Sequence, residues 1–124
     1  MAEGVVTRES PRSFGETLAR LERAIADLGL ILFARIDHRA GARQAGLDMH
    51  EATVLVFGNP AGGTAAMLKE PLAALDMPLR VLVWEADGGA RVSFQEPSFV
   101  ARRFGIAAAI PQRAEAVVDA ALES

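Results

Sequence analysis

The chain has 124 residues, the length of one ordinary domain, and can bury a core without disulfides or a structural metal. It contains no cysteine, which excludes disulfides, thiolate metal sites and cysteine nucleophiles. Its formal net charge of -3 argues against a general attraction to nucleic acid. The start lacks the pattern of a signal peptide, and no apolar run approaches the roughly 18 residues of a membrane span, so we expect a cytoplasmic protein without membrane helices.

The spacing of apolar residues predicts strands and helices in alternation. Pro71 interrupts the third helix because proline cannot donate the backbone hydrogen bond that a helix needs. The turn at 87–89 joins the last two strands as an antiparallel hairpin. In chain order the predicted elements are a strand at 4–10, a helix at 10–30, a strand at 30–38, a short helix at 39–47, a strand at 51–58, a helix at 64–77, strands at 79–86 and 90–96, and helices at 97–104 and 111–123.

The helix at 10–30 has two alternative starts. Ser10 is a cap with a proline in the next position, whereas Ser13 forms a capping box with Glu16. Gly29 is placed to end the helix.

The order of elements and the terminal hairpin exclude a purely parallel sheet. We expect one α+β domain over residues 1–124, a two-layer arrangement with a mostly antiparallel sheet and helices packed on one face. A doubly wound α/β fold is the alternative.

The stretch FGNPAGGTAAM, at 57–67, indicates a strand, a glycine-rich loop and a helix start. Unpaired N–H groups at a helix start can hold an anion, and Gly62 and Gly63 would let a ligand approach closely, with Thr64 as a hydroxyl donor. The alternative is a simple turn at Asn59 with Thr64 as the helix cap. The stretch lacks the Gly-Lys-Ser/Thr ending of a nucleotide-binding P-loop.

Arg35, Asp37 and His38 gather at the end of the strand at 30–38. A histidine beside an acid can act as a general base near neutral pH, but adjacent strand residues point to opposite faces, so Asp37 is poorly placed to orient His38. With only two histidines in the chain, no His-rich metal site is predicted. Strict alternation places Leu30, Leu32, Ala34, Ile36 and His38 on one face and Ile31, Phe33, Arg35 and Asp37 on the other.

Four stretches resemble, in order, the bacterial and archaeal family catalogued as domain of unknown function three hundred and two: SFGETLARLERAIADLGLILFARIDHRAGARQAGL, TVLVFGNPAGGTAAM, MPLRVLVWEADGGARVSF and EPSFVARRFGI. The resemblance covers 10–106 and implies a small, commonly dimeric α+β fold without an established reaction. Family members usually carry Tyr-Asn where this chain has Phe94 and Gln95, and His-Gly where it has Phe104 and Gly105. If the tyrosine and histidine belong to a polar site, that site is altered in this protein.

We therefore expect a bacterial, non-catalytic homodimer that binds a small molecule or anion, with no nucleic-acid or membrane partner and no cofactor that the sequence identifies. Two alternatives remain open, namely an enzyme that uses His38 with a carboxylate such as Glu85 or Glu96, and a structural or partner-binding accessory dimer. The candidate ligand-binding residues are Arg35, His38, Asn59, Gly62, Gly63 and Thr64.

Overall fold

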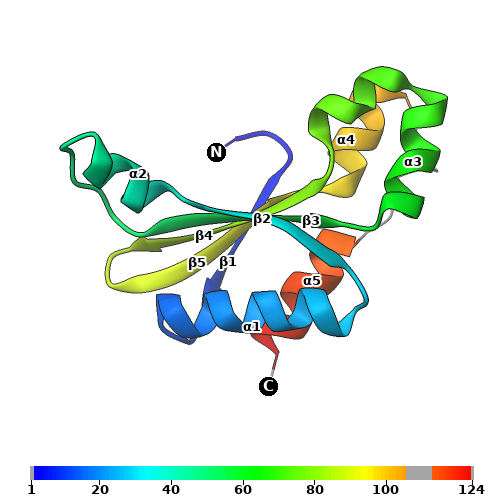
Figure 1. Ribbon diagram of the computed structural model, residues 1–124. Coiled ribbons are helices and arrows are strands. Elements are labelled where there is room, and N and C mark those ends of the chain that lie inside the picture. Colours follow the sequence, from blue (N-terminus) through cyan, green and yellow to red (C-terminus); the bar gives the residue numbers. More distant parts are fainter. Residues whose placement is uncertain (1, 106–112, 124) are drawn as a thin grey trace.

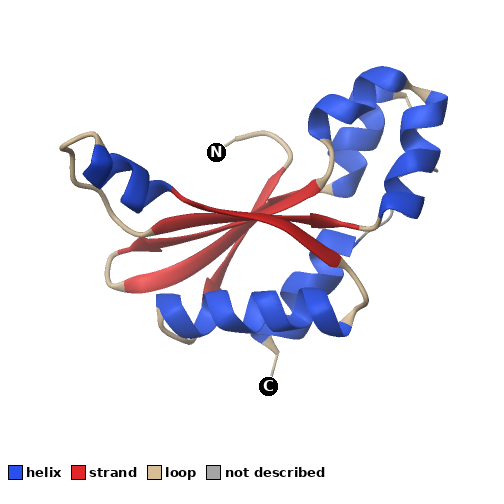
Figure 2. Cartoon of the chain, viewed as in Figure 1, coloured by secondary structure: helices blue, strands red, loops and turns tan. Residues whose placement is uncertain are grey.

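A five-stranded antiparallel sheet forms the centre of the computed structural model, which describes residues 2–105 and 113–123. The strands lie in the order β1-β5-β4-β3-β2. Figure 2 shows them in red, with the helices in blue. They are β1 (Val5–Ser10), β2 (Ile31–Asp37), β3 (Ala52–Gly58), β4 (Leu79–Ala86) and β5 (Gly89–Gln95). The helices are α1 (Phe14–Asp27), α2 (His38–Gln44), α3 (Pro60–Lys69), the 3-10 helix η1 (Pro71–Asp76), α4 (Pro97–Phe104) and α5 (Arg113–Leu122). The predicted α+β fold is confirmed, and the doubly wound alternative is wrong because every neighbouring strand pair is antiparallel.

The main core lies between one face of the sheet and the helices α1 and α5, which share that side (Figure 1). Alternate residues of the central strands point toward this layer, because the side chains of a strand alternate between its two faces. The helix α1 contributes Leu18, Leu21 and Ile25 at helical spacing. The buried members of this core are Leu18, Leu21, Ala24, Ile25, Leu30, Leu55, Phe57, Val81, Val83, Val92, Phe94, Ala114, Val117, Val118 and Ala121.

Ser13 caps α1 and so decides between the two predicted starts. Its Oγ accepts a hydrogen bond from the Glu16 N–H at 3.2 Å, as a capping box requires. Ser10 instead ends β1, where its hydroxyl lies 2.7 Å from Thr17 Oγ1. Gly29 follows the helix with a φ of +74°, as expected for a residue that ends a helix.

The strand β2 departs from strict alternation. Its register with β3 shifts between Leu32 and Ala34, so that Leu32 lies opposite Phe57 and Arg35 lies opposite Leu55. Both partners belong to the main core, so Leu32 and Arg35 point to the α1 side of the sheet. The predicted assignment of these two residues to opposite faces was wrong, because a bulge inserts one extra residue and reverses the alternation beyond it.

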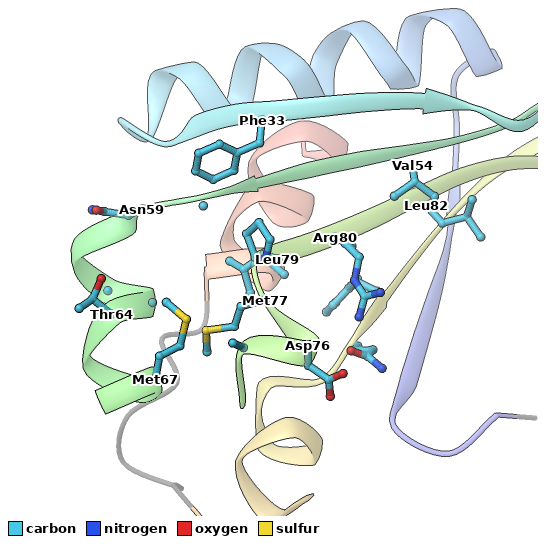
Figure 3. A pocket seen from close by; sticks show the side chains of 18 of the residues that line it. Phe33, Val54, Asn59, Thr64, Met67, Asp76, Met77, Leu79, Arg80 and Leu82 are labelled. Carbon is cyan, nitrogen blue, oxygen red and sulfur yellow. The ribbon is translucent and has the colours of Figure 1, made fainter. Parts of the chain in front are cut away.

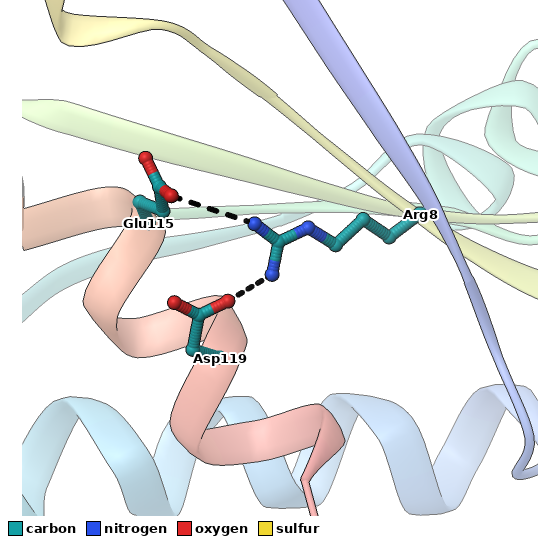
Figure 4. A network of polar contacts seen from close by, with 3 residues as sticks. All are labelled: Arg8, Glu115 and Asp119. Atoms are coloured by element: carbon teal, nitrogen blue, oxygen red, sulfur yellow. Dashed lines mark hydrogen bonds and ion pairs between the residues drawn. The ribbon is translucent and has the colours of Figure 1, made fainter.

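The helix α5 is tied to the edge strand β1 by ion pairs (Figure 4). Arg8 of β1 pairs with Asp119, and its Nη2 lies 3.7 Å from Glu115 Oε1. The same guanidinium lies over the Phe94 ring, 5.7 Å from the ring centroid. From α1, Arg20 donates hydrogen bonds to two carbonyl oxygens at the end of α5. These contacts hold α5 on the core.

The segments α3, η1 and α4 gather at one end of the sheet, on the side away from α1 and α5 (Figure 1). The helix α3 ends before Pro71, as predicted, although it begins at Pro60 rather than at Thr64. Arg103 of α4 donates a hydrogen bond to Asp76 at 2.9 Å and so joins α4 to η1. The small cluster that these segments share consists of Ala66, Ala73, Met77 and Phe104.

Candidate functional site: a pocket between the sheet and α3

A pocket of about 630 Å³ lies between the sheet face opposite α1 and the segment formed by α3 and η1 (Figure 3). Its walls come mainly from β3, β4, β5, α3 and the residues that follow η1. The larger apolar side chains that line it are Val5, Phe33, Val54, Met67, Met77, Leu79, Leu82 and Phe94. The side chains with polar groups are Asn59, Thr64, Asp76, Arg80, Ser93 and Gln95.

Two glycines keep space open in the pocket. A Cβ on Gly58 would lie 3.4 Å from Pro78 Cβ and 3.7 Å from Phe33 Cε2. A Cβ on Gly63, in the first turns of α3, would lie 3.6 Å from Met77 Sδ and so would enter the pocket wall. A large side chain at Gly63 would therefore occupy space that a ligand needs.

The glycine-rich segment is the first part of a helix rather than a loop. Asn59 caps α3, since its Oδ1 accepts a hydrogen bond from the Ala61 N–H at 3.0 Å. Its main-chain oxygen accepts hydrogen bonds from the N–H groups of Gly62 at 3.0 Å and Gly63 at 3.1 Å. These three N–H groups already have partners within the segment, and the cap is Asn59 rather than Thr64.

Asp76 and Arg80 are the charged side chains that line the pocket among the residues described. Asp76 is only 10% exposed and accepts the hydrogen bond from Arg103, so its charge is balanced outside the pocket. Arg80 is exposed and lies opposite Val56 in the register of β3 and β4. It forms no ion pair with any residue in 2–105 or 113–123. The charge of Arg80 is therefore available to a ligand.

The hydroxyl of Ser93 belongs to a polar cross-link on the pocket side of the sheet. Ser93 Oγ shares a hydrogen bond with Thr7 Oγ1 at 2.8 Å and accepts one from Trp84 Nε1 at 3.0 Å. The indole is in turn flanked by the Arg91 guanidinium, 5.4 Å from its ring centroid, and by the His50 ring at 6.4 Å. Neither partner of Ser93 Oγ is a base that could activate it as a nucleophile.

The structure brings four of the six predicted ligand-binding residues together. Asn59, Gly62, Gly63 and Thr64 line the pocket. Arg35 lies on the other side of the sheet, where its Nη1 is 3.4 Å from Glu22 Oε2 of α1.

His38 is separate from the pocket. It is the first residue of α2, and Asp37 caps this helix by accepting a hydrogen bond from the Ala40 N–H at 2.9 Å. In the described part of the chain, His38 has no hydrogen bond or ion pair with Glu85 or Glu96, and none of the three lines the pocket. Across the same residues, no group of three His, Asp or Glu side chains is arranged to hold a metal ion.

Sequence reasoning missed Arg80 and the two methionines. The strand β4 carries a signal for Arg80, because it is the one charged residue in the alternate row Arg80, Leu82 and Trp84, which is otherwise apolar or aromatic. No local pattern joins Met67 to Met77, which come from different segments and meet only in the fold. The two residues that depart from the family pattern, Phe94 and Gln95, also line the pocket.

The chain matches the family model described as Domain of unknown function DUF302 over residues 6–124. This protein belongs to the DUF302 family. The matched range includes the C-terminal helix, which lay beyond the resemblance over 10–106. A crystal structure of an uncharacterized conserved DUF302 protein from Bacillus stearothermophilus has a TM-score of 0.80 at 19% identity and covers 98% of both chains. That likeness shows that the two proteins share the fold.

Curated relatives of this DUF302 chain include proteins named fluoride-specific ion channel FluC 1 from Brucella suis and Brucella abortus. Each is 38% identical over 105 residues, which make up 83% of this chain. The same match covers 41% and 38% of the two relatives, so this chain spans about two fifths of their length. Within the residues described, no helix is both long and apolar enough to cross a bilayer.

Proposed function

We propose that this DUF302 protein binds a small, mainly apolar molecule in the pocket between its sheet and α3. The observation that carries the proposal is a volume of about 630 Å³ lined mainly by large apolar side chains. Small-molecule sites commonly enclose about 300–1,000 Å³ and combine apolar walls with a few polar groups. Met67 and Met77 add flexible, polarisable side chains that adapt to the shape of a ligand.

We propose binding rather than catalysis for this pocket. A general base must come within hydrogen-bond reach of the proton that it removes. Asp76, the carboxylate on the pocket, is held by Arg103, and the Ser93 hydroxyl is engaged by Thr7 and Trp84. The enzyme alternative would place its chemistry at His38, which lies outside the pocket.

The relatives named as fluoride channels suggest fluoride as a second candidate ligand. A small anion needs convergent hydrogen-bond donors to replace the water that it loses. At the start of α3 the N–H groups of Ala61, Gly62 and Gly63 are already hydrogen-bonded to Asn59, and much of the remaining lining is apolar. We therefore favour a larger molecule, with fluoride as a comparison in the test.

The proposal can be tested with small molecules that bind in the pocket and with a substitution that blocks it. Ligands found in a thermal-shift screen of small aromatic and aliphatic molecules, phosphate and fluoride should raise the Tm of the native protein, because they bind its folded state. Gly63→Leu should weaken their binding by more than about tenfold, equivalent to about 1.4 kcal/mol, because the new side chain would meet Met77 and Met67. Isothermal titration calorimetry gives the Kd values.

Gly15→Leu is the matched control, since Gly15 also lies at the start of a helix but has nothing within 4 Å of the position that an added Cβ would take. It should leave the Kd unchanged. Equal binding by the native protein and by Gly63→Leu would place the ligand elsewhere and refute the proposal.

We also propose that two copies pair along the edge strand β2. All seven residues of β2 are exposed, and its large apolar side chains Ile31, Leu32, Phe33 and Ile36 are 38–49% exposed. An exposed apolar edge strand offers unpaired backbone groups that favour pairing with another strand. Two antiparallel copies of β2 related by a two-fold axis at the centre of the strand would bring these apolar side chains together.

Ile36→Lys should convert a dimer to a monomer in size-exclusion chromatography with light scattering, weakening association by at least about tenfold, because the interface would then have to bury two lysines among apolar side chains. Leu28→Lys is the control, since Leu28 is 38% exposed but caps α1 rather than lying on β2. A dimer that survives Ile36→Lys, or a native monomer, would refute pairing through β2. A dimer with an empty pocket would favour the structural or partner-binding alternative.

A further inference from the structure

We propose that the ligand of this pocket is an amphipathic monoanion, with an apolar body and one carboxylate or similar group held by Arg80. This inference rests on the proposed binding function and adds the chemical class of the ligand. The position of Arg80 supports this ligand class. Its guanidinium has no ion pair in the described part of the chain and lies at the edge of a wall of apolar side chains.

The charge around the pocket favours an anion. Arg80 and Arg103 bring two positive charges to this end of the fold. Among the described residues that line the pocket, Asp76 is the one that carries a carboxylate. Arg103 already holds Asp76 at 2.9 Å, so Arg80 keeps an unmatched positive charge. A guanidinium binds a carboxylate through two parallel hydrogen bonds, which also orient the ligand.

The two charged side chains lie apart from the phenyl ring of Phe33 and from Met67 (Figure 3). In Figure 3, Arg80 and Asp76 lie toward one side, whereas Phe33 and Met67 lie toward the other. Gln95 lines the pocket as well and offers an amide beside the β4–β5 part of the wall. An amphipathic molecule can therefore place its anionic group at Arg80 while its body contacts the phenyl ring and the methionine.

The same lining argues against a highly charged ligand. Arg80 can balance one negative charge, and a second charge would lie against apolar walls without a partner, at a cost in desolvation. Phe33 and the methionines Met67 and Met77 favour an aromatic body, because thioether sulfur makes favourable contacts with aromatic rings. A monoanion with a ring system satisfies both conditions.

A set of probes with one body and three charges tests the inference: 2-naphthoate, 2-naphthylmethanol and 2-naphthylmethylammonium. We expect the native protein to bind naphthoate about tenfold more tightly than the alcohol, and the ammonium probe most weakly. Arg80→Met keeps most of the side-chain length but removes the charge, so it should equalise the Kd values of naphthoate and the alcohol. Arg80→Lys should retain a preference for naphthoate. Calorimetry at low and high salt provides the measurement, and only naphthoate binding should weaken with salt.

Arg43→Met is the control for net charge, because Arg43 is an exposed residue of α2 outside the pocket lining. It should preserve the preference for naphthoate. If the native protein binds all three probes equally, or if Arg80→Met retains the preference, the anion assignment is wrong while the apolar binding function stands. Strongest binding of the ammonium probe would also overturn the assignment. Failure of every apolar compound in the wider screen would instead refute the proposed function itself.

Discussion

Gly4→Ala is expected to lower the free energy of unfolding by about 3 kcal/mol, since it combines backbone strain with a steric clash. Gly4 has a φ of +75°, which costs an alanine about 1 kcal/mol. A Cβ there would also overlap the Phe99 ring and lie 2.8 Å from Phe99 Cβ. The main-chain oxygen of Gly4 accepts a hydrogen bond from the Glu96 N–H at 2.7 Å, so the backbone is held against α4. Urea unfolding monitored by circular dichroism would measure the change.

Gly29→Ala separates the strain from the clash. Gly29 has nearly the same φ, +74°, but nothing lies within 4 Å of the position of an added Cβ. Its substitution should cost only about 1 kcal/mol. In the background of Phe99→Ala, the cost of Gly4→Ala should fall but stay above that of Gly29→Ala, because the ring is gone while the Cβ at position 99, 2.8 Å from the added Cβ, remains. Equal costs for Gly4→Ala and Gly29→Ala in the native background would contradict the clash.

Arg8→Met is expected to lower the free energy of unfolding by about 2 kcal/mol. The substitution removes the pairs with Glu115 and Asp119 and the contact with the Phe94 ring. It also leaves two like charges four residues apart on α5, which disfavours the helix. The Arg8 side chain is 32% exposed, so the loss should be smaller than for a fully buried pair. Thermal unfolding at several salt concentrations would show the loss, and its size should shrink as salt increases.

Arg91→Met provides the comparison. Arg91 is 29% exposed, pairs with two acids and lies over an aromatic ring, as Arg8 does. Its acidic partners Glu9 and Asp87 are 82% and 92% exposed, so water already screens them. We expect a loss of at most about 1 kcal/mol. If Arg91→Met costs as much as Arg8→Met, the docking of α5 does not depend on its ion pairs.

Local patterns predicted the elements of this fold because their causes are local. The capping box of Ser13 and Glu16, the interruption at Pro71 and the hairpin turn with Asp87 at a φ of +54° depend on neighbouring residues alone. The start of α3 was misplaced, because Asn59 supplies a cap that lets the helix include the two glycines. The bulge in β2 was also missed, since the pairing with β3 produces it.

The candidate site divides in the same way. The stretch from Asn59 to Thr64 was recognised because a glycine-rich strand-to-helix segment is a local signal, and it does line the pocket. Arg80 and Met77 were not recognised, because a strand residue becomes part of a site only when another segment covers that face of the sheet. Arg35 shows the converse, since the bulge turns it toward Glu22 and away from the pocket.

By itself, the sequence determined the order of the elements and the antiparallel hairpin, because hydrophobic periodicity and turn residues act over a few positions. Membership of the DUF302 family followed from the similarity of whole sequence stretches to that family. Only the tertiary structure decided which residues surround the pocket and which arginine keeps an unmatched charge. Both depend on distances between residues far apart in the chain, as the pairing of Asp76 with Arg103 rather than Arg80 illustrates.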